Sequence, residues 1–405
     1  MNEAVQSRKL CWLVPDDKGG GVVSVALSCC REARAAGHTV TLLMLLPPTG
    51  HISEHVDFEL VSLDVIAPGC DAPKKIVDWL AKNPQDVLFL NGCEQADVAI
   101  PFLPTQTRSV YVVHDTAPRY WRAALRHEEQ LDAIVAVSNT VARIFQHRLR
   151  QPEKLRVLHN GTLFPVAVDN PQLNSRAPDI LFLGGDEPIK GAYDVLKLWP
   201  KLIEQGFMGN LHWFGRVSPA FASQIEKIPR ASAVVLQGRV VRSQIFRQAA
   251  SARILLMLSR NEPFGMATIE CMGMGAVPVA WDIQTGTKEI VEDDYPFFAP
   301  LGDYDELADR VLKACADHHR YWQAAARRAR EGFGEAAMWR RYASFIDEVM
   351  AFPRAERAKG GQSPPTFRPR VRLFQLLPKK LRATVRSTIG RSARMGYWLR
   401  NFRGI

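Results

Sequence analysis

Apolar stretches of strand length alternate along this chain with segments whose apolar residues recur at helical spacing. The first stretch is KLCWLVPDD at residues 9–17, and a glycine loop and a helix ending at Gly37 follow it. Further strand-like runs occupy residues 86–92, 109–115 and 155–162. Because parallel strands must be joined by crossover connections, this alternation predicts an α/β protein with sheets wound by helices.

A polar, proline-containing segment at residues 165–178 interrupts the alternation and suggests a domain boundary. Strands are expected again at residues 179–185, 210–217 and 252–259. The last helical segment is expected to return to the first domain. The sequence thus predicts a first domain, a second domain, a crossover helix and a basic tail, at residues 1–168, 169–335, 336–353 and 354–405.

Two glutamates, Glu262 and Glu270, are the most informative residues of the chain. They bound the segment EPFGMATIE, which follows an apolar run, so Glu262 is expected in a loop past a strand and a helix should begin near Gly265. Along a helix Glu270 would return within roughly 80° of the azimuth of Glu262, ~12 Å further on. Two such carboxylates can accept hydrogen bonds from sugar or ribose hydroxyls in one cleft. The same spacing also fits two surface glutamates at a helix start, where the helix dipole favours acidic side chains.

Two glycine turns offer close approach of a ligand to the backbone. Residues 19–21 are glycines between a strand and a helix, where a phosphate or sugar could meet a helix N-terminus, although a simple flexible turn fits as well. In the second turn Lys190 stands just before Gly191, and its ammonium could reach a diphosphate at the helix start. A solvated surface lysine is the alternative.

His114 ends the strand-like run at residues 109–115 and is followed by Asp115. Open α/β sheets bind their ligands at the carboxyl ends of strands, so the imidazole could donate a hydrogen bond to a sugar hydroxyl or carbonyl. A lone histidine is more often structural, and Asp115 is a weaker candidate.

The segment SRNEPFGMATIECMGMGAVPVAWD at residues 259–282 resembles the acidic signature of the retaining glycosyltransferases of family four. Other stretches agree with that family along most of residues 9–350. The resemblance implies the GT-B architecture, in which two Rossmann-like, doubly wound domains face each other. It also implies metal-independent transfer of a hexose or hexosamine, with retention of configuration, from a nucleotide sugar to a glycan or lipid-linked glycan.

The resemblance also assigns roles to individual residues. Catalytic roles fall on Glu262, His114 and Lys190. Glu262 would face the donor sugar, His114 would lie near its reacting centre, and Lys190 would hold the diphosphate. Donor-binding roles fall on glycine-turn residues, on the turn that contacts the nucleobase and on the helix start with its ribose-binding glutamate: Gly20, Gly21, Gly184, Gly185, Arg239, Val240, Phe264, Gly265, Met266 and Glu270.

One residue departs from the family pattern. Relatives usually carry an arginine directly after the first glycine of the donor-phosphate turn, whereas this chain has Gly185 there. Either another base substitutes, with Arg239 and Arg216 as the candidates, or the leaving group is stabilised less.

No metal and no cofactor beyond the nucleotide sugar are expected. The D-x-D string at residues 303–305 opens a predicted helix in the wrong region for a catalytic metal. The cysteines are odd in number and lack a C-x-x-C, which favours reduced core thiols over a disulfide framework or a zinc site. They are Cys11, Cys29, Cys30, Cys70, Cys93, Cys271 and Cys315.

The basic character of the chain is concentrated at its end. Residues 354–405 carry 14 Lys or Arg and a single acid, so their net charge of +13 leaves −3 for the rest of a chain whose total is +10. Residues 358–370 are rich in Gly, Pro and Ser and are expected to be a flexible linker. Residues 379–403 combine basic helical spacing with an aromatic end, which favours an anionic membrane surface. A disordered tail and a nucleic-acid contact are the alternatives, and no nucleic acid partner is expected.

The polar N-terminus and the lack of a long apolar run predict a cytoplasmic protein, peripheral on the cytoplasmic face of the inner membrane. Two other functions compete with glycosyl transfer. A nucleotide-sugar epimerase or hydrolase would consume the donor without an acceptor, and a non-catalytic component would bind a nucleotide sugar or glycan without turnover.

Overall fold

The computed structural model describes residues 6–18, 20–50, 52, 56–65, 71–165, 177–292 and 294–368. Backbone contacts divide the chain into two compact units. The first consists mainly of Met1–Leu163 and Glu335–Leu377, and the second mainly of Phe164–Gly334. The expected membrane segment at 379–403, Gly19 and Cys70 lie outside the described residues.

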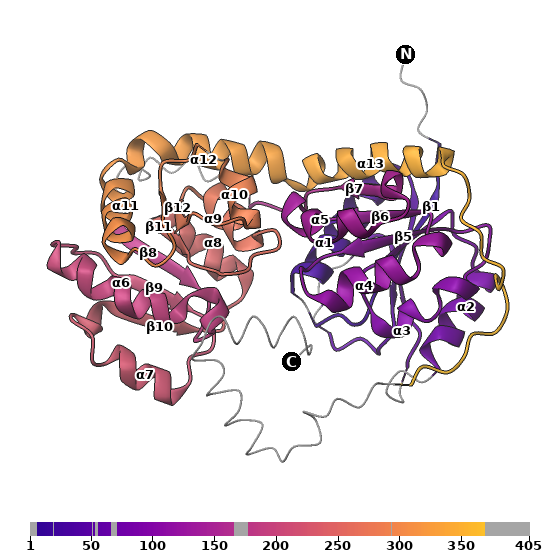
Figure 1. Cartoon of the computed structure of the whole chain (residues 1–405), viewed down its shortest axis with the longest axis horizontal. Helices are drawn as coiled ribbons and strands as arrows, with labels where there is room; N and C mark the ends of the chain where they lie inside the picture. The colour runs from indigo at the N-terminus through magenta and orange to yellow at the C-terminus, as the bar shows by residue number, and fades with distance from the viewer. Residues whose placement is uncertain are drawn as a thin grey trace. The chain divides into compact units, whose positions relative to one another are not determined.

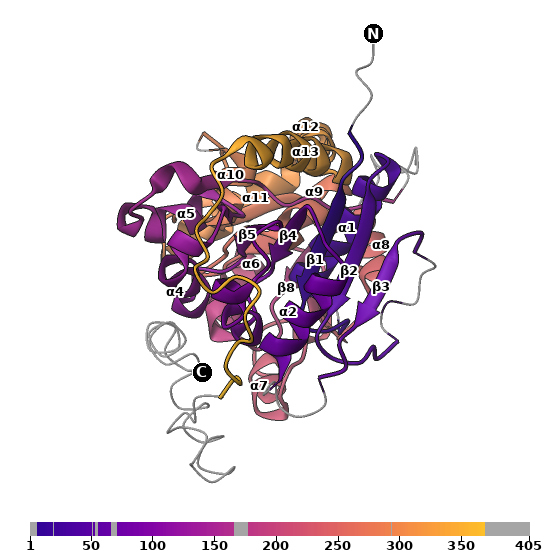
Figure 2. The same cartoon turned by 90° about the vertical axis from the view of Figure 1, so that its right-hand side faces the viewer.

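The first unit is built on a parallel sheet with the strand order β3-β2-β1-β4-β5-β6-β7. Figure 2 shows β3, β2 and β1 next to one another at one side of this sheet. The central strands are almost wholly apolar and buried, as expected for a parallel sheet covered on both faces. The strands are β1 (Lys9–Val14), β2 (Thr39–Met44), β3 (Glu59–Ser62), β4 (Val87–Leu90), β5 (Arg108–Val113), β6 (Ala133–Ala136) and β7 (Leu155–Val157).

Helices cover this sheet, and α13, which follows the second unit in the sequence, joins them. The α13 helix packs on α1 in the first unit (Figure 1). Trp12 and Phe89 stack at 4.6 Å across neighbouring strands, and Tyr342 of α13 meets the Phe89 ring edge-on. The helices are α1 (Gly21–Ala35), α2 (Ala72–Lys82), α3 (Glu94–Asp97), α4 (Pro118–Arg126), α5 (Asn139–Phe145) and α13 (Glu335–Ala351).

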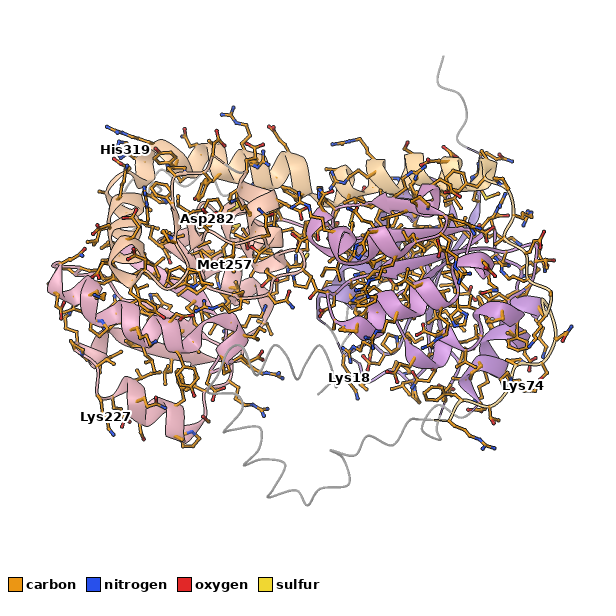
Figure 3. All side chains as sticks on the ribbon, viewed as in Figure 1. Lys18, Lys74, Lys227, Met257, Asp282 and His319 are labelled. Carbon is orange, nitrogen blue, oxygen red and sulfur yellow. The ribbon has the colours of Figure 1, made fainter. Side chains whose placement is uncertain are left out.

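The second unit contains a parallel sheet with the order β10-β9-β8-β11-β12-β13. Successive residues of β8 face opposite sides, so Ile180 and Phe182 join one buried cluster and Leu181 the other. Side chains fill the space between this sheet and its helices, where Met257 is buried while Lys227 lies at the surface (Figure 3). The strands are β8 (Ala177–Leu183), β9 (Leu211–Phe214), β10 (Val234–Gly238), β11 (Ala252–Met257), β12 (Val277–Trp281) and β13 (Phe298–Ala299).

Two layers of helices enclose the second sheet. The α6 and α11 helices contact each other on one face, and α8, α9 and α12 form contacts on the other. The helices are α6 (Ala192–Glu204), α7 (Pro219–Ile225), α8 (Arg242–Ser251), α9 (Met266–Gly273), α10 (Gly286–Val291), α11 (Tyr304–Ala316) and α12 (His318–Phe333). A 3₁₀ turn, η6 (Pro188–Lys190), precedes α6.

Both units have the doubly wound topology that the alternation of the sequence predicted. The direction of strand succession reverses between β1 and β4 in the first unit and between β8 and β11 in the second. In open parallel sheets, ligands bind outside the carboxyl ends of the strands at such a reversal. The loops after β8 and β11 are therefore where a ligand site of the second unit is expected.

The chain after α13 is folded against the first unit, which its composition did not indicate. Figure 2 shows the yellow trace of this segment running along the unit. Arg357 is only 6% exposed, and the Gly361 amide donates to the Phe102 carbonyl. Residues 358–361, the start of the expected flexible linker, are therefore held against the first unit. The buried Arg357 and the hydrogen bond of Gly361 fix the backbone at either end of them. No helix among the described residues is long and apolar enough to cross a membrane. The six described cysteines are buried and free.

Candidate functional site

The turn after β8 contains Gly184 and Gly185, and its backbone lies against the turn after β9. Gly185 has a φ of +53°, and a Cβ atom there would lie 2.6 Å from the carbonyl oxygen of Arg216. Its amide donates to the Phe214 carbonyl at 2.9 Å, and Trp213 donates its indole N–H to the Gly185 carbonyl. This close approach leaves no room for a side chain, which explains in local terms why a glycine stands at position 185.

Lys190 is placed by two contacts between the turn after β8 and the loop after β11. Gly191, with a φ of +88°, begins α6, and a Cβ there would lie 2.5 Å from the Cβ of Leu258. The Arg260 amide donates to the Ile189 carbonyl at 2.8 Å. Lys190 therefore lies at the strand reversal between β8 and β11.

Glu262 lies in the loop between β11 and α9, as predicted. The Nζ atom of Lys190 is 2.8 Å from Oε2 of Glu262, and the Glu262 side chain is 13% exposed. The Glu262 carbonyl accepts a hydrogen bond from the Gly286 amide at 2.7 Å. Two of the three predicted catalytic residues thus meet at the strand reversal as a partly buried ion pair.

The helix predicted to begin near Gly265 is α9, which starts at Met266 with Gly265 as its N-cap. Phe264 is buried and packs edge-on against Phe333 at 5.8 Å. Further along α9, Glu270 pairs with Arg242, the first residue of α8, at 2.9 Å. The two glutamates thus have separate cationic partners, Lys190 for Glu262 and Arg242 for Glu270.

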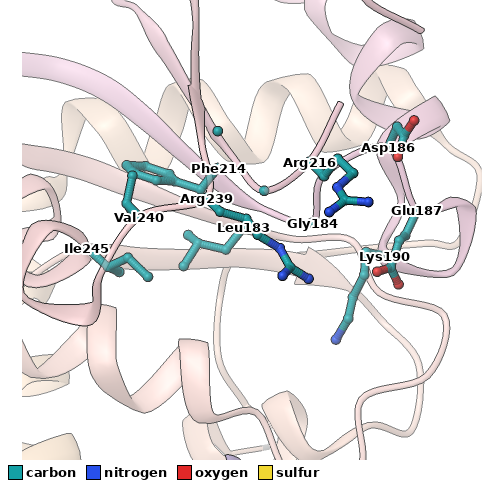
Figure 4. Close-up of a pocket in the computed structure, with 13 residues that line it drawn as sticks. Leu183, Gly184, Asp186, Glu187, Lys190, Phe214, Arg216, Arg239, Val240 and Ile245 are labelled. Atoms are coloured by element: carbon teal, nitrogen blue, oxygen red, sulfur yellow. The ribbon is translucent and has the colours of Figure 1, made fainter. Parts of the chain in front are cut away.

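A pocket of about 570 Å³ opens over the turns after β8, β9 and β10. Figure 4 shows the side chains of Arg216 and Arg239 extending toward the part of this pocket where Lys190 lies. Of the predicted site residues, Gly184, Gly185, Lys190, Arg239 and Val240 line it. Glu262, Phe264, Gly265, Met266 and Glu270 do not, although Glu262 reaches the pocket lining through its contact with Lys190.

The first unit places His114 directly after β5. Its Nε2 lies 2.9 Å from Oδ1 of Asn91, whose amide nitrogen donates to the Leu13 and Phe89 carbonyls. Because an amide oxygen only accepts, Nε2–H is the donor and Nδ1 of the neutral ring is an acceptor. Burial lowers the pKa of His114 to about 4, so the ring is neutral near pH 7. The ring therefore offers a ligand an acceptor at Nδ1, whereas the sequence suggested a donor.

Gly20 and Gly21 begin α1 in the first unit. Gly20 is the N-cap, with a φ of +99°, and nothing lies within 4 Å of a Cβ built on it. Asp115, the weaker candidate, accepts a hydrogen bond from the Ala117 amide and so caps the turn before α4. The open space at Gly20 suits close approach of a ligand, whereas Asp115 has a structural contact.

The D-x-D string has structural contacts at the start of α11 in the second unit. Asp303 caps α11 by accepting from the Glu306 amide at 3.0 Å, and Asp305 pairs with Lys201. Among the described residues, no group of three or more His, Cys, Asp or Glu side chains is arranged to hold a metal ion.

Three residues of the site were missed by the sequence reasoning. Asn91 orients His114, and its position after a buried strand, at the same sheet edge as His114, was the available signal. Arg260 pairs with Asp194 of α6 at 2.8 Å, and Arg242 pairs with Glu270. No local pattern announces these two arginines, because their partners are far apart in the sequence.

The comparisons with known proteins agree with this architecture. The family described as glycosyltransferase family 4 matches residues 19–162, and the family described as glycosyl transferases group 1 matches residues 177–317. None of the curated proteins matches the chain.

Solved structures resemble the chain over most of its length. A glycosyltransferase from Rickettsia africae ESF-5 is 16% identical with a TM-score of 0.70, covering 85% of this chain and 99% of that one. Anabaena HepE in complex with UDP is 18% identical with a TM-score of 0.67, covering 84% and 100%. A mutant of S. aureus TarM in complex with Fondaparinux, alpha-GlcNAc-glycerol and UDP is 10% identical with a TM-score of 0.69, covering 84% and 100%. At these identities the likeness concerns the fold. Because both family models match and both units are doubly wound α/β structures, the chain belongs to the group 1 glycosyltransferases of the GT-B type.

Proposed function

We propose that this glycosyltransferase retains anomeric configuration and moves a hexose or hexosamine from a nucleotide-diphosphate sugar to a glycan or lipid-linked glycan. The observation that carries the proposal is the ion pair of Lys190 and Glu262 at the strand reversal of the second unit. A nucleotide sugar needs acceptors for the hydrogen bonds of its hydroxyls and a positive charge near its phosphates. The carboxylate at that place meets the first need and the ammonium meets the second.

In the proposed reaction the bond between the anomeric carbon and the phosphate oxygen breaks, and its electron pair stays on the departing nucleoside diphosphate. Lys190 and the N-terminus of α6 stabilise that growing negative charge. Glu262 accepts hydrogen bonds from the sugar, and Glu270 accepts them from the ribose. The proposal requires no metal ion, because fixed positive charges of the chain serve the diphosphate.

The remaining assigned residues complete the donor site. Gly184 and Gly185 allow the backbone to approach the diphosphate, and the backbone of Arg239 and Val240 borders the nucleobase. The turn of Phe264, Gly265 and Met266 presents amides to the sugar. In the first unit, Gly20 and Gly21 border the diphosphate and the acceptor. His114 accepts a hydrogen bond from the sugar through Nδ1, which follows from its Nε2–H donation to Asn91. Retention follows if the acceptor hydroxyl attacks from the face that the phosphate leaves, with its proton passing to a phosphate oxygen.

The first test is a screen of nucleotide sugars, with and without a membrane lipid extract. UDP-sugars come first, because HepE and TarM were each solved in complex with UDP. Transfer that depends on the extract supports the proposal. Release of the sugar without an acceptor would point to a hydrolase or epimerase, and binding without turnover would point to a non-catalytic component.

The second test is Glu262→Gln, with Glu226→Gln as the matched control. Glu226 is exposed at the end of α7 in the same unit, outside the pocket lining. We expect the Glu262 variant to remain folded and to lose transfer by about 10- to 100-fold, because a hydrogen bond between a charged group and the reacting sugar contributes about 1.5–3 kcal/mol. Full activity of Glu262→Gln would reject the assignment.

We also propose that the enzyme works at the cytoplasmic face of a membrane, held there by residues 379–403. This rests on the composition of that segment, with its basic residues and aromatic end. Flotation with anionic vesicles should recover the full chain but not a chain that ends at residue 368. Equal flotation of both would reject the tail as the membrane contact.

A further inference from the structure

Three neighbouring strands of the second unit end in glycine turns, and an arginine follows the glycine in two of them. The turn after β8 is Gly184-Gly185, the turn after β9 is Gly215-Arg216, and β10 ends at Gly238 before Arg239. The strands β8, β9 and β10 are adjacent in the sheet. The cation that is absent after β8 is therefore present on each of the next two turns.

The backbone joins these turns into one layer. The Gly185 amide donates to the Phe214 carbonyl, and the Asp186 amide donates to the Arg216 carbonyl at 3.0 Å. The Gly215 amide donates to the Gly238 carbonyl at 2.7 Å. Since the amides of Gly185 and Asp186 are already used, they cannot also bind a phosphate. The charged side chains of the lining are therefore better placed to bind an anion than these two amides are.

The side chains that line the pocket show which charges are available. Lys190 is paired with Glu262, and Asp186 accepts from the Ser218 amide. Arg216 and Arg239 are exposed, and within the described parts of the chain neither guanidinium has a carboxylate within 4.0 Å. Both point toward Lys190 in Figure 4. Glu187 is the other acid in the lining, so the side chains around the pocket carry more positive than negative charge.

We propose that Arg216 and Arg239 together bind the diphosphate of the donor, in place of the side chain that position 185 cannot carry. This rests on the proposed function, because it names the residues that hold the leaving group of the same reaction. A guanidinium donates two parallel hydrogen bonds to phosphate oxygens, so two of them can neutralise a diphosphate without an amide cradle. Arg239 then contacts phosphate, a role different from the nucleobase contact that the resemblance gave it.

Two guanidiniums at the diphosphate would act on the leaving group of the reaction. As the anomeric carbon–oxygen bond breaks, its electron pair remains on the β-phosphate oxygen, and the acceptor hydroxyl later gives its proton to a phosphate oxygen. The guanidiniums stay protonated throughout, because the pKa of arginine lies far above neutral pH. They therefore act by fixed charge, and they should stabilise the departing diphosphate more than they stabilise the bound donor.

The test uses inorganic pyrophosphate as the probe, because it needs neither the correct nucleobase nor the correct sugar. Calorimetric affinities are compared for the full-length wild type, Arg216→Gln, Arg239→Gln and the double variant. Each single change should weaken pyrophosphate binding by about tenfold or more, as loss of a charge-assisted hydrogen bond implies. Lysine at both positions should restore part of the affinity. The control is Arg247→Gln, which removes the same charge from an exposed residue of α8 that does not line the pocket.

The outcomes separate this proposal from the proposed function. If both arginine variants bind pyrophosphate as tightly as Arg247→Gln does, the assignment of Arg216 and Arg239 is wrong, whatever the enzyme transfers. If they lose pyrophosphate binding while the wild type turns over no nucleotide sugar, the anion site stands and the proposed function falls. A third readout is the donor itself. The double variant should lower kcat for the best nucleotide sugar by a larger factor than it raises KM, and an effect confined to KM would contradict a role at the leaving group.

Discussion

Replacing Arg357 by methionine should destabilise the first unit strongly, although the residue lies beyond α13. The guanidinium is buried and makes five hydrogen bonds within the first unit. Methionine keeps the apolar stem but removes every donor. The acceptors that lose their partner are the carbonyls of Gln130, Pro104 and Thr107, the hydroxyl of Ser109 and the carboxylate of Asp132.

The size of the effect follows from what remains around Asp132. That carboxylate is 1% exposed and keeps Arg108 at 3.0 Å, together with the amides of Ser109 and Ala355. It is therefore not left without partners, and the cost falls short of a fully orphaned buried charge. Loss of the hydrogen bonds to three carbonyls and of one charged pair, at about 1 kcal/mol each, should lower the free energy of unfolding by about 3–5 kcal/mol. For a unit of this size that loss lowers the melting temperature by roughly 6–20 °C.

Differential scanning calorimetry measures this change, and hydrogen exchange of peptides from β5 assigns it to the first unit. Arg354→Met is the matched control. Arg354 also donates to two carbonyls, those of Thr105 and Gln106, but it is exposed, so its loss should cost less than about 1 kcal/mol. If Arg357→Met melts within 2 °C of Arg354→Met, as roughly 1 kcal/mol would allow, the reasoning from burial fails.

Three further predictions concern pH, packing and truncation. Burial raises the pKa of Asp97 from the usual 3.8 to about 7, so the contribution of this residue to stability should be full below pH 3.8 and be lost as pH rises through 7, by about 4 kcal/mol. Denaturation curves of Asp97→Asn across pH 4 to 8 should lack that fall, and an unchanged slope would contradict it. Gly286→Ala should cost the second unit about 1–3 kcal/mol and weaken transfer, because a Cβ there would lie 2.0 Å from the Phe264 carbonyl oxygen. Gly332→Ala, with nothing within 4 Å, is its control. A chain ending at residue 368 should melt like the full chain, whereas one ending at residue 352 should melt no higher than Arg357→Met, because it also loses the Ala355 amide that Asp132 accepts from.

The fold was largely predictable because its determinants are local. Parallel strands buried on both faces read as continuous apolar runs, and the glycine turns mark where β8 and the helix after it meet. The β3 strand was not predicted because it has only four residues and none of them is fully buried. The anchored segment around Arg357 escaped for a different reason. Its composition is that of a linker, and the contacts that hold it, such as the one with Asp132, are made to residues far away in the sequence.

The site was predictable as a set of residues and less so as a set of contacts. Spacing placed Glu262 in a loop and Gly265 at a helix start, as the structure has them. It could not show that Glu270 pairs with Arg242, since the two residues belong to different helices that meet only after folding. It also could not show that Gly185 lacks room for a side chain, which depends on the neighbouring turn of Arg216.

The ion pair of Lys190 and Glu262 gives the clearest case of a contact with a functional meaning. Each residue was expected to serve a different part of the donor, yet in the structure each satisfies the other, because a partly buried charge without a partner is costly. Under the proposed function, a diphosphate carries more negative charge than one carboxylate and can draw the ammonium toward itself. Glu262 then needs new donors, and the hydroxyls of a sugar supply them. A nucleoside diphosphate without its sugar would leave that carboxylate unsatisfied. The pair therefore favours the complete donor over its hydrolysed product. This preference should shrink in Glu262→Gln, because a neutral amide loses little when Lys190 moves to the diphosphate.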